Sequence, residues 1–122
     1  NEVIKMEKDE RKYKSFSDPQ NLILATMAQN EFLKESEVLA DLIQKSLDKK
    51  LTSPNRGVKQ AGFYVLVGAS MPNVLVETGF LSNNQEAKML SKSKYQKKIA
   101  NGIFEGLLDF KNKYETSFIT TN

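Results

Sequence analysis

The chain has 122 residues, a hydrophobic fraction of 39% and a net charge of +3, with no histidine, cysteine or tryptophan. Without cysteine it forms neither a disulfide nor a thiolate nucleophile. Without histidine it lacks the commonest general base at neutral pH and the commonest zinc ligand, which disfavours a zinc site built from this chain alone. Lysines and acids are interleaved, and no apolar run approaches about 20 residues. We therefore expect one domain of ordinary size, with neither a nucleic-acid partner nor a membrane span.

The first fifty residues predict a charged segment followed by one long helix. Residues 1–18 are rich in charge and poor in apolar anchors, so we expect a short helix at most, or disorder. Asp18 and Pro19 form a helix start, an N-cap acid before a proline at the first helical position. Apolar residues then recur at helical spacing, which predicts an amphipathic helix over 19–50. Its apolar stripe is typical of core packing, with an interaction face as the alternative.

Beyond the turn residues 52–57, two short apolar segments predict strands. Residues 61–67 and 74–76 are rich in aromatic and β-branched side chains without clean alternation, which indicates burial on both faces in an α/β sheet. The link over 68–73 is too short for a helical crossover, so neighbouring strands here would be antiparallel. Two strands alone make a poor sheet. The sequence thus favours either a part of a larger sheet or a chain that completes its sheet by self-association.

Two capping boxes predict two helices that close the chain. Asn83 is followed three residues later by Glu86, and Ser93 is followed in the same way by Gln96. The last helix is expected to bury an apolar stripe with a spacing of three or four, formed by Tyr95, Ile99, Ile103, Leu107, Phe110 and Tyr114. Residues 116–122 have no such pattern and are expected to fray.

Glu77 is the leading candidate for a functional residue because it ends the predicted strand over 74–76. Folds of the α/β class place their sites in the crevice at the strand ends. Partial desolvation there favours a neutral carboxyl group, which suits proton transfer from a water to a leaving amine. The alternative is a carboxylate that is solvated or bonded to nearby backbone amides. Arg56 would clamp an anionic group or pair with an acid, Asn83 would bind ligand or cap a helix, and Ser70 has no histidine to activate it.

A longer motif resembles a known family. Residues 56–66 read Arg-Gly-Val-Lys-Gln-Ala-Gly-Phe-Tyr-Val-Leu, and residues 71–83 read Met-Pro-Asn-Val-Leu-Val-Glu-Thr-Gly-Phe-Leu-Ser-Asn. Together they resemble the C-terminal signature of the amidase-3 family of N-acetylmuramoyl-L-alanine amidases, which are hydrolases of cell-wall peptidoglycan. The resemblance covers residues 56–110 well and is weaker over 1–50.

The resemblance implies a three-layer α/β fold with a mixed central sheet, of which this chain would be the C-terminal part. It also implies a zinc ion held by two histidines and a glutamate from the N-terminal half, with Glu77 as the catalytic carboxylate that moves the proton of a zinc-bound water. Because the chain has no histidine, no metal ligand is assigned to it. Because the zinc-binding half is missing, the chain is expected to be incomplete and inactive alone; it also begins at Asn1 rather than methionine and opens with no signal peptide.

The same resemblance implies peptidoglycan as the substrate, a periplasmic or extracellular location, and a divisome activator protein as a partner. Residues 1–40 fall where some members carry a helical segment that blocks the site, with Glu7 and Glu10 as the candidate blocking acids. Two alternatives stay open: a metal-free amidase-like module that binds peptidoglycan or a partner protein, and a basic domain that binds anionic polymers.

Overall fold

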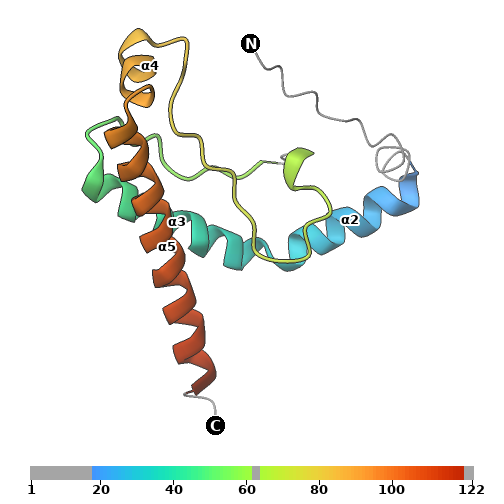
Figure 1. The fold of residues 1–122 in the computed structure, drawn as a ribbon. Helices are drawn as coiled ribbons and strands as arrows, with labels where there is room; N and C mark the ends of the chain where they lie inside the picture. Colours follow the sequence, from blue (N-terminus) through green and yellow to red (C-terminus); the bar gives the residue numbers. More distant parts are fainter. Residues whose placement is uncertain (1–17, 62–63, 120–122) are drawn as a thin grey trace.

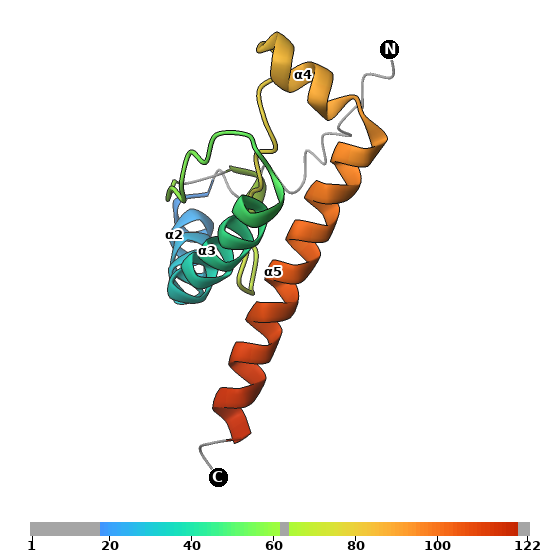
Figure 2. The ribbon, with the colours of Figure 1, turned by 90° about the vertical axis from the view of Figure 1, so that its left-hand side faces the viewer.

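The computed structural model describes residues 18–61 and 64–119, and within these ranges the chain is helical (Figure 1). The elements are α2 (Pro19–Glu31), α3 (Leu33–Lys50), the 3-10 turn η1 (Tyr64–Leu66), α4 (Asn84–Leu90) and α5 (Ser93–Ile119). α3 and α5 cross each other, α2 extends from the start of α3 away from α5, and α4 lies at the N-terminal end of α5 (Figures 1 and 2). The core lies at the crossing and consists of Leu39, Ile43 and Leu47 of α3 with Tyr95 and Ile99 of α5.

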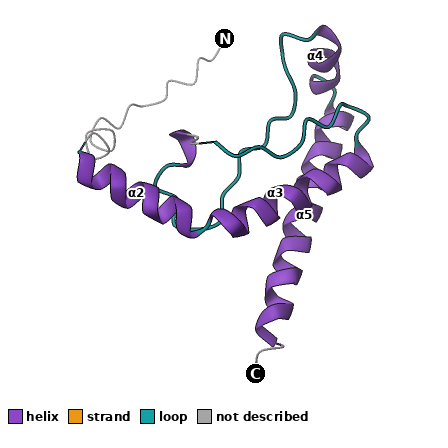
Figure 3. Ribbon diagram, turned by 180° about the vertical axis from the view of Figure 1, so that it is seen from behind, coloured by secondary structure: helices purple, strands orange, loops and turns teal. Residues whose placement is uncertain are grey.

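The predicted α/β fold with two buried strands is wrong, because the described ranges contain no strand (Figure 3). In place of the first strand, η1 forms a 3-10 turn, and the Ala69 N–H donates to the Leu66 carbonyl just after it. In place of the second strand, residues 74–76 belong to a loop. β-Branched and aromatic side chains favour an extended backbone locally, but a strand also needs a neighbour for its ladder of hydrogen bonds. No described segment supplies that neighbour.

The loop over 74–77 covers the core with one face only. Val74 and Val76 pack against the core at the crossing of α3 and α5, whereas Leu75 between them is 45% exposed. Glu77, the next residue, is exposed as well. The expectation of burial on both faces is therefore wrong, and the alternation places Glu77 on the outer side of the loop.

The predicted helix over 19–50 is divided at Phe32 into α2 and α3. Its start is as expected, since the Asp18 side chain accepts from the Gln20 N–H at 3.1 Å and Pro19 follows the cap. Phe32 has φ −103° and ψ 12°, and its carbonyl accepts a bond of 2.6 Å from the Ser36 hydroxyl. A serine that bonds to the carbonyl four residues earlier bends a helix. The large apolar side chains of α2 lie outside the core and are exposed: Leu22, Ile23, Leu24 and Met27.

Two glycines of α5 allow α3 to approach closely. Gly102 and Gly106 are one turn apart and both are buried. A Cβ on Gly106 would lie 2.6 Å from the Ile43 Cα, and a Cβ on Gly102 would lie 2.6 Å from the Leu47 Cδ2. Ser46 is buried on the same face of α3, and its hydroxyl has no hydrogen-bond partner among the described residues. What this position requires is therefore a small side chain and not a polar one. Small residues on both helices therefore set the separation of α3 and α5.

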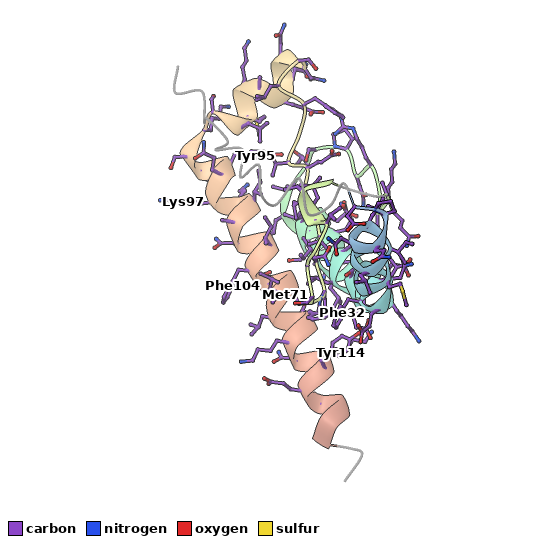
Figure 4. The ribbon with its side chains drawn as sticks, turned by 90° about the vertical axis from the view of Figure 1, so that its right-hand side faces the viewer. Phe32, Met71, Tyr95, Lys97, Phe104 and Tyr114 are labelled. Carbon is purple, nitrogen blue, oxygen red and sulfur yellow. The ribbon has the colours of Figure 1, made fainter. Side chains whose placement is uncertain are left out.

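The buried face of α5 follows most of the predicted stripe, since Ile103 and Phe110 are partly buried against the core. Tyr95 and Ile99 are buried as expected, but Leu107 is 46% exposed. Lys97 and Phe104 project from the side of α5 that faces away from α2 and α3 (Figure 4). The helix also continues to Ile119, past the point where fraying was expected. None of the helices in the described ranges combines the length and apolar character that crossing a membrane requires.

Replacing Gly106 by alanine is expected to destabilise the chain by up to about 2 kcal/mol. Alanine gains about 1 kcal/mol over glycine in a helix, but overpacking against backbone costs roughly 1–3 kcal/mol. The obstructing atom is the Cα of Ile43, which can move only if the helices separate. Urea unfolding followed by circular dichroism measures the change.

Gly102→Ala is the matched control, because the atom in its way is the flexible end of the Leu47 side chain. It is expected to cost less than Gly106→Ala. Equal or higher stability in Gly106→Ala than in the wild type would contradict the close crossing.

Candidate functional site

The loop that carries Glu77 is fixed to α3 at its first end. The backbone N–H of Asn73 donates to the Ser36 hydroxyl at 3.0 Å, and that hydroxyl donates in turn to the Phe32 carbonyl. The Asn73 side-chain amide donates to the Met71 carbonyl at 2.7 Å, which tightens the turn before the loop. Ser36 therefore has two roles, since it bends the helix at Phe32 and holds the start of the loop.

The second end of the loop is fixed to α4 through Glu86. The backbone N–H of Phe80 donates to Glu86 Oε2 at 2.5 Å. Gly79 has φ 152°, which favours glycine, and a Cβ there would lie 3.0 Å from the same Glu86 oxygen. A side chain on residue 79 would therefore press against this carboxylate, which adds to the preference for glycine there. Glu77 lies between this attachment and the one at Asn73.

Arg56 connects a second loop to the same carboxylate. The Asn55 side chain accepts from the Gly57 N–H at 2.7 Å and donates to Asp48 of α3 at 2.6 Å, which fixes the turn around Arg56. Arg56 Nη2 lies 2.5 Å from Glu86 Oε1. Its guanidinium carbon lies 4.7 Å from the centroid of the Phe80 ring, within the range of a cation–π contact. Of the two roles considered for Arg56, the structure has it paired with an acid.

Asn83 caps α4, as the sequence predicts. Its side-chain oxygen accepts from the backbone N–H groups of Gln85 and Glu86 at 3.0 and 3.2 Å. The reciprocal half of the capping box differs, because the Asn83 N–H donates to the Phe80 carbonyl while Glu86 reaches the Phe80 N–H. The second predicted box is not formed in this way, since Ser93 is already helical and Gln96 donates from its side chain to the Leu90 carbonyl.

A groove with a volume of ≈ 1200 Å³ lies between α3 and the two loops. Residues 53–61 and 73–80 line it, together with one face of α3 that includes Ile43 and Leu47. The Tyr95 hydroxyl donates to the Ser53 hydroxyl at 3.1 Å, which joins the first loop to α5. Glu77 is part of the lining and is exposed, so its carboxylate is accessible to water and to a ligand in the groove.

Sequence reasoning named Glu77 but did not recognise the role of Glu86, which it assigned only to a helix cap. A signal was present in the sequence, because Glu86 falls within the same motif-bearing region as Arg56 and Phe80. The other candidate, Ser70, is exposed in the turn before the loop and does not line the groove. Glu7 and Glu10 lie outside the described residues.

The environment of Glu86 favours its ionised form. Its pKa is held below the ordinary value of 4.5, first by the hydrogen bond from the Phe80 N–H and then by the hydrogen bond from Arg56. Partial desolvation acts in the opposite direction, and the charge of Arg56 adds to the lowering. The carboxylate is thus charged at neutral pH, in the form that accepts both bonds.

The region that forms this arrangement belongs to a family with a shared sequence pattern. Residues 6–109 match the family model described as N-acetylmuramoyl-L-alanine amidase. This match covers most of the chain, so the chain belongs to the N-acetylmuramoyl-L-alanine amidase family of the amidase-3 type. The resemblance inferred from the two motifs is thereby confirmed.

Curated relatives agree with this membership. The chain is 38% identical to an uncharacterised cell wall amidase of Bacillus anthracis over 70% of the chain and 16% of that protein. It is 40% identical to a germination-specific N-acetylmuramoyl-L-alanine amidase of Bacillus subtilis over 62% of the chain and 32% of that protein. With the amidase AmiA of Escherichia coli it shares 34% identity over 72% of the chain and 30% of that protein. The chain thus spans about a third or less of these relatives. No solved structure matches it.

The family implies a zinc ion, and the residues present do not fit one. The sequence has no histidine and no cysteine, so only carboxylates are available as charged ligands. In the part of the chain that the structure describes, no three acidic side chains gather where they could hold a metal ion. Both carboxylate oxygens of Glu86 already accept hydrogen bonds, one from Arg56 and one from the Phe80 N–H. No zinc ligand is therefore assigned to this chain.

Acidification is expected to destabilise the chain in part through Glu86. Because the folded pKa is lower than the ordinary value of 4.5, this carboxylate stabilises the fold fully above pH 4.5. That stabilisation is lost as the pH falls from 4.5 through the folded pKa. Thermal unfolding midpoints measured from about pH 6 to about pH 3 should fall less steeply in Glu86→Gln than in the wild type.

The exposed Asp109 on α5 provides the control for this series. Asp109→Asn should retain the wild-type slope. If Glu86→Gln also retained it, the attachment at Glu86 would be absent in solution.

Proposed function

We propose that this chain is part of a cell-wall hydrolase that cleaves the amide bond between N-acetylmuramic acid and L-alanine in peptidoglycan, with Glu77 as its catalytic carboxylate. The observation that carries the proposal is the position of Glu77. It is exposed, it lines a groove of ≈ 1200 Å³, and it lies on a loop held at both ends within the region matched by the family. The relatives from Bacillus subtilis and Escherichia coli are named as amidases of this bond.

The proposed role of Glu77 is to move one proton. A water oxygen attacks the amide carbonyl carbon, and the carboxylate accepts a proton from that water. The same proton is then donated to the amide nitrogen as the carbon–nitrogen bond breaks. The products are a carboxylic acid on the lactyl group of the muramic acid and a free amino group on the alanine. An open groove suits this reaction because the substrate is a polymer that cannot enter a closed pocket.

The remaining parts of the proposal concern the metal, the location of the protein, a partner and the blocking acids. We infer that zinc and the histidines that bind it are supplied from outside these 122 residues, since the chain has no histidine. The substrate places the protein in the cell envelope or the extracellular space, and specifically in the periplasm where an outer membrane is present. An activator of the cell-division machinery as a partner, and Glu7 or Glu10 as blocking acids, remain hypotheses.

Glu77→Gln is expected to lower the release of peptides from peptidoglycan by about 10²–10⁴-fold, because an amide cannot carry the proton. The assay uses a form of the protein that shows this activity and counts newly exposed alanine amino groups. Glu105→Gln, an exposed acid of α5 outside the groove, is the control and should remain active. Full activity of Glu77→Gln would remove Glu77 from the mechanism.

The purified 122-residue chain is expected to hold far less than one zinc ion per chain. The measurement is elemental analysis after equilibration with zinc and removal of the excess. One tightly bound zinc per chain would mean that carboxylates of this chain build a site, and it would overturn the assignment of the metal to other sequence.

A second candidate is a metal-free module that binds peptidoglycan without cleaving it. The complete absence of histidine favours it. Sedimentation with purified peptidoglycan separates the two functions when it is combined with the release assay. A module of this kind would bind peptidoglycan but release no peptides in any form of the protein, and Glu77→Gln would bind as the wild type does.

A further inference from the structure

Glu86 has an arrangement that a simple helix cap does not explain. A glutamate at the third position of a helix ordinarily returns to the N–H of the capping residue. Here the N–H of the capping residue, Asn83, is used by the Phe80 carbonyl, and Glu86 extends three residues further back to the Phe80 N–H. α4 is already capped by the Asn83 side chain. The carboxylate of Glu86 is therefore available for a different task.

The two oxygens of Glu86 hold two separate segments. Oε2 accepts from the Phe80 backbone and Oε1 accepts from Arg56, which lies 30 positions away from Glu86 in the sequence. The Glu86 side chain is 12% exposed and the Arg56 side chain is 45% exposed, so the pair is partly shielded from water on the Glu86 side. The Arg56 guanidinium also lies over the Phe80 ring, which closes a triangle of contacts among the three residues.

This triangle lies next to the proposed catalytic residue. Glu77 is three residues before Phe80, and on the other side of Glu77 the loop backbone is held by the bond from Asn73 to Ser36. Without the bond at the Phe80 N–H, residues 77–80 would keep the packing of Val76, the bond from the Asn83 N–H to the Phe80 carbonyl and the contact of Arg56 with the Phe80 ring. The link from the loop to the Arg56 turn through Glu86 would be lost.

We propose that Glu86 is a positioning residue that joins the Arg56 turn to the Phe80 backbone and thereby holds Glu77 at the groove. The inference rests on the proposed function for the significance of Glu77, but the junction itself is a property of the 122-residue chain. Glu86 is part of the groove lining, but both of its oxygens are used by Arg56 and Phe80. Its effect on the reaction passes through the loop that it holds.

The first test is amide hydrogen exchange of Phe80 in the 122-residue chain, measured by nuclear magnetic resonance. Glu86→Ala should raise the exchange rate of this amide by about tenfold or more, because a hydrogen bond to a charged group is lost. Gln85→Ala, on the neighbouring exposed residue of α4, is the matched control and should leave the rate unchanged. An unchanged rate in Glu86→Ala, with the helices intact by circular dichroism, would overturn the proposal.

A measurement on the wild-type chain covers the case in which Glu86→Ala fails to fold. The chemical shift of the Phe80 amide proton should follow one titration with a midpoint below 4.5, the ordinary value for Glu86. An amide that does not respond to pH in this range would contradict the bond to the carboxylate. Neither measurement depends on hydrolysis. Both can therefore support or contradict the junction at Glu86 even if the proposed function is wrong.

Kinetics then separate positioning from support of the fold. In a form of the protein that cleaves peptidoglycan, Glu86→Gln should lower kcat by about tenfold or more while KM stays nearly constant, since a misplaced catalytic group slows the chemical step. Gln85→Ala should keep both constants. If Glu86→Gln lowered the amount of folded protein but left kcat per folded molecule unchanged, Glu86 would act on stability alone. That result would overturn its positioning role.

Discussion

The close approach of α3 and α5 is the constraint on which the rest of the structure depends. Gly106 faces the backbone of Ile43, and Gly102 faces Leu47, so the helices meet through backbone where large side chains would keep them apart. The hydrophobic residues flanking this contact, including Tyr95 and Ile99, form the core. The loop with Val74 and Val76 packs on that core. A wider crossing would remove the surface on which the loop rests.

The site is built from loops, and polar attachments give those loops a defined shape. Buried packing alone fixes only one face of the segment around Val76, because its neighbours Leu75 and Glu77 are exposed. The position of Glu77 along the groove depends on hydrogen bonds from backbone N–H groups to Ser36 and Glu86. Loops held in this way commonly carry functional residues, because the scaffold fixes them without burying them.

Local signals in the sequence predicted two of the helix caps correctly, whereas the capping box at Ser93 was wrong. Asp18 and Asn83 were recognised as helix caps, since a cap involves only neighbouring residues. The family was recognised from the residues around Glu77, which form a long and specific motif. The candidate site follows from that motif alone, and the assignment of Glu77 as the catalytic residue remains a prediction.

What the sequence did not predict depends on contacts between distant residues. The apolar segments 61–67 and 74–76 have strand-like composition, but pairing requires a neighbour that composition does not specify. The glycines of α5 were not recognised as a packing face, because a pattern of apolar side chains gives no weight to residues without one. The junction of Arg56 with Glu86 spans 30 positions and was beyond any local rule. In each case the sequence pattern did not indicate which distant residue of the chain makes the contact.

The two attachments of the Glu77 loop differ in chemical character, and this difference has a consequence for the ionic environment. The attachment at Asn73 ends on a neutral hydroxyl, whereas the one at Phe80 ends on a carboxylate that also pairs with an exposed arginine. Dissolved ions screen the pairing of charged groups but have little effect on a neutral hydrogen bond. At high ionic strength only the charged part of the Phe80 attachment would weaken, whereas the neutral bonds at Asn73 and from Asn83 to the Phe80 carbonyl would persist.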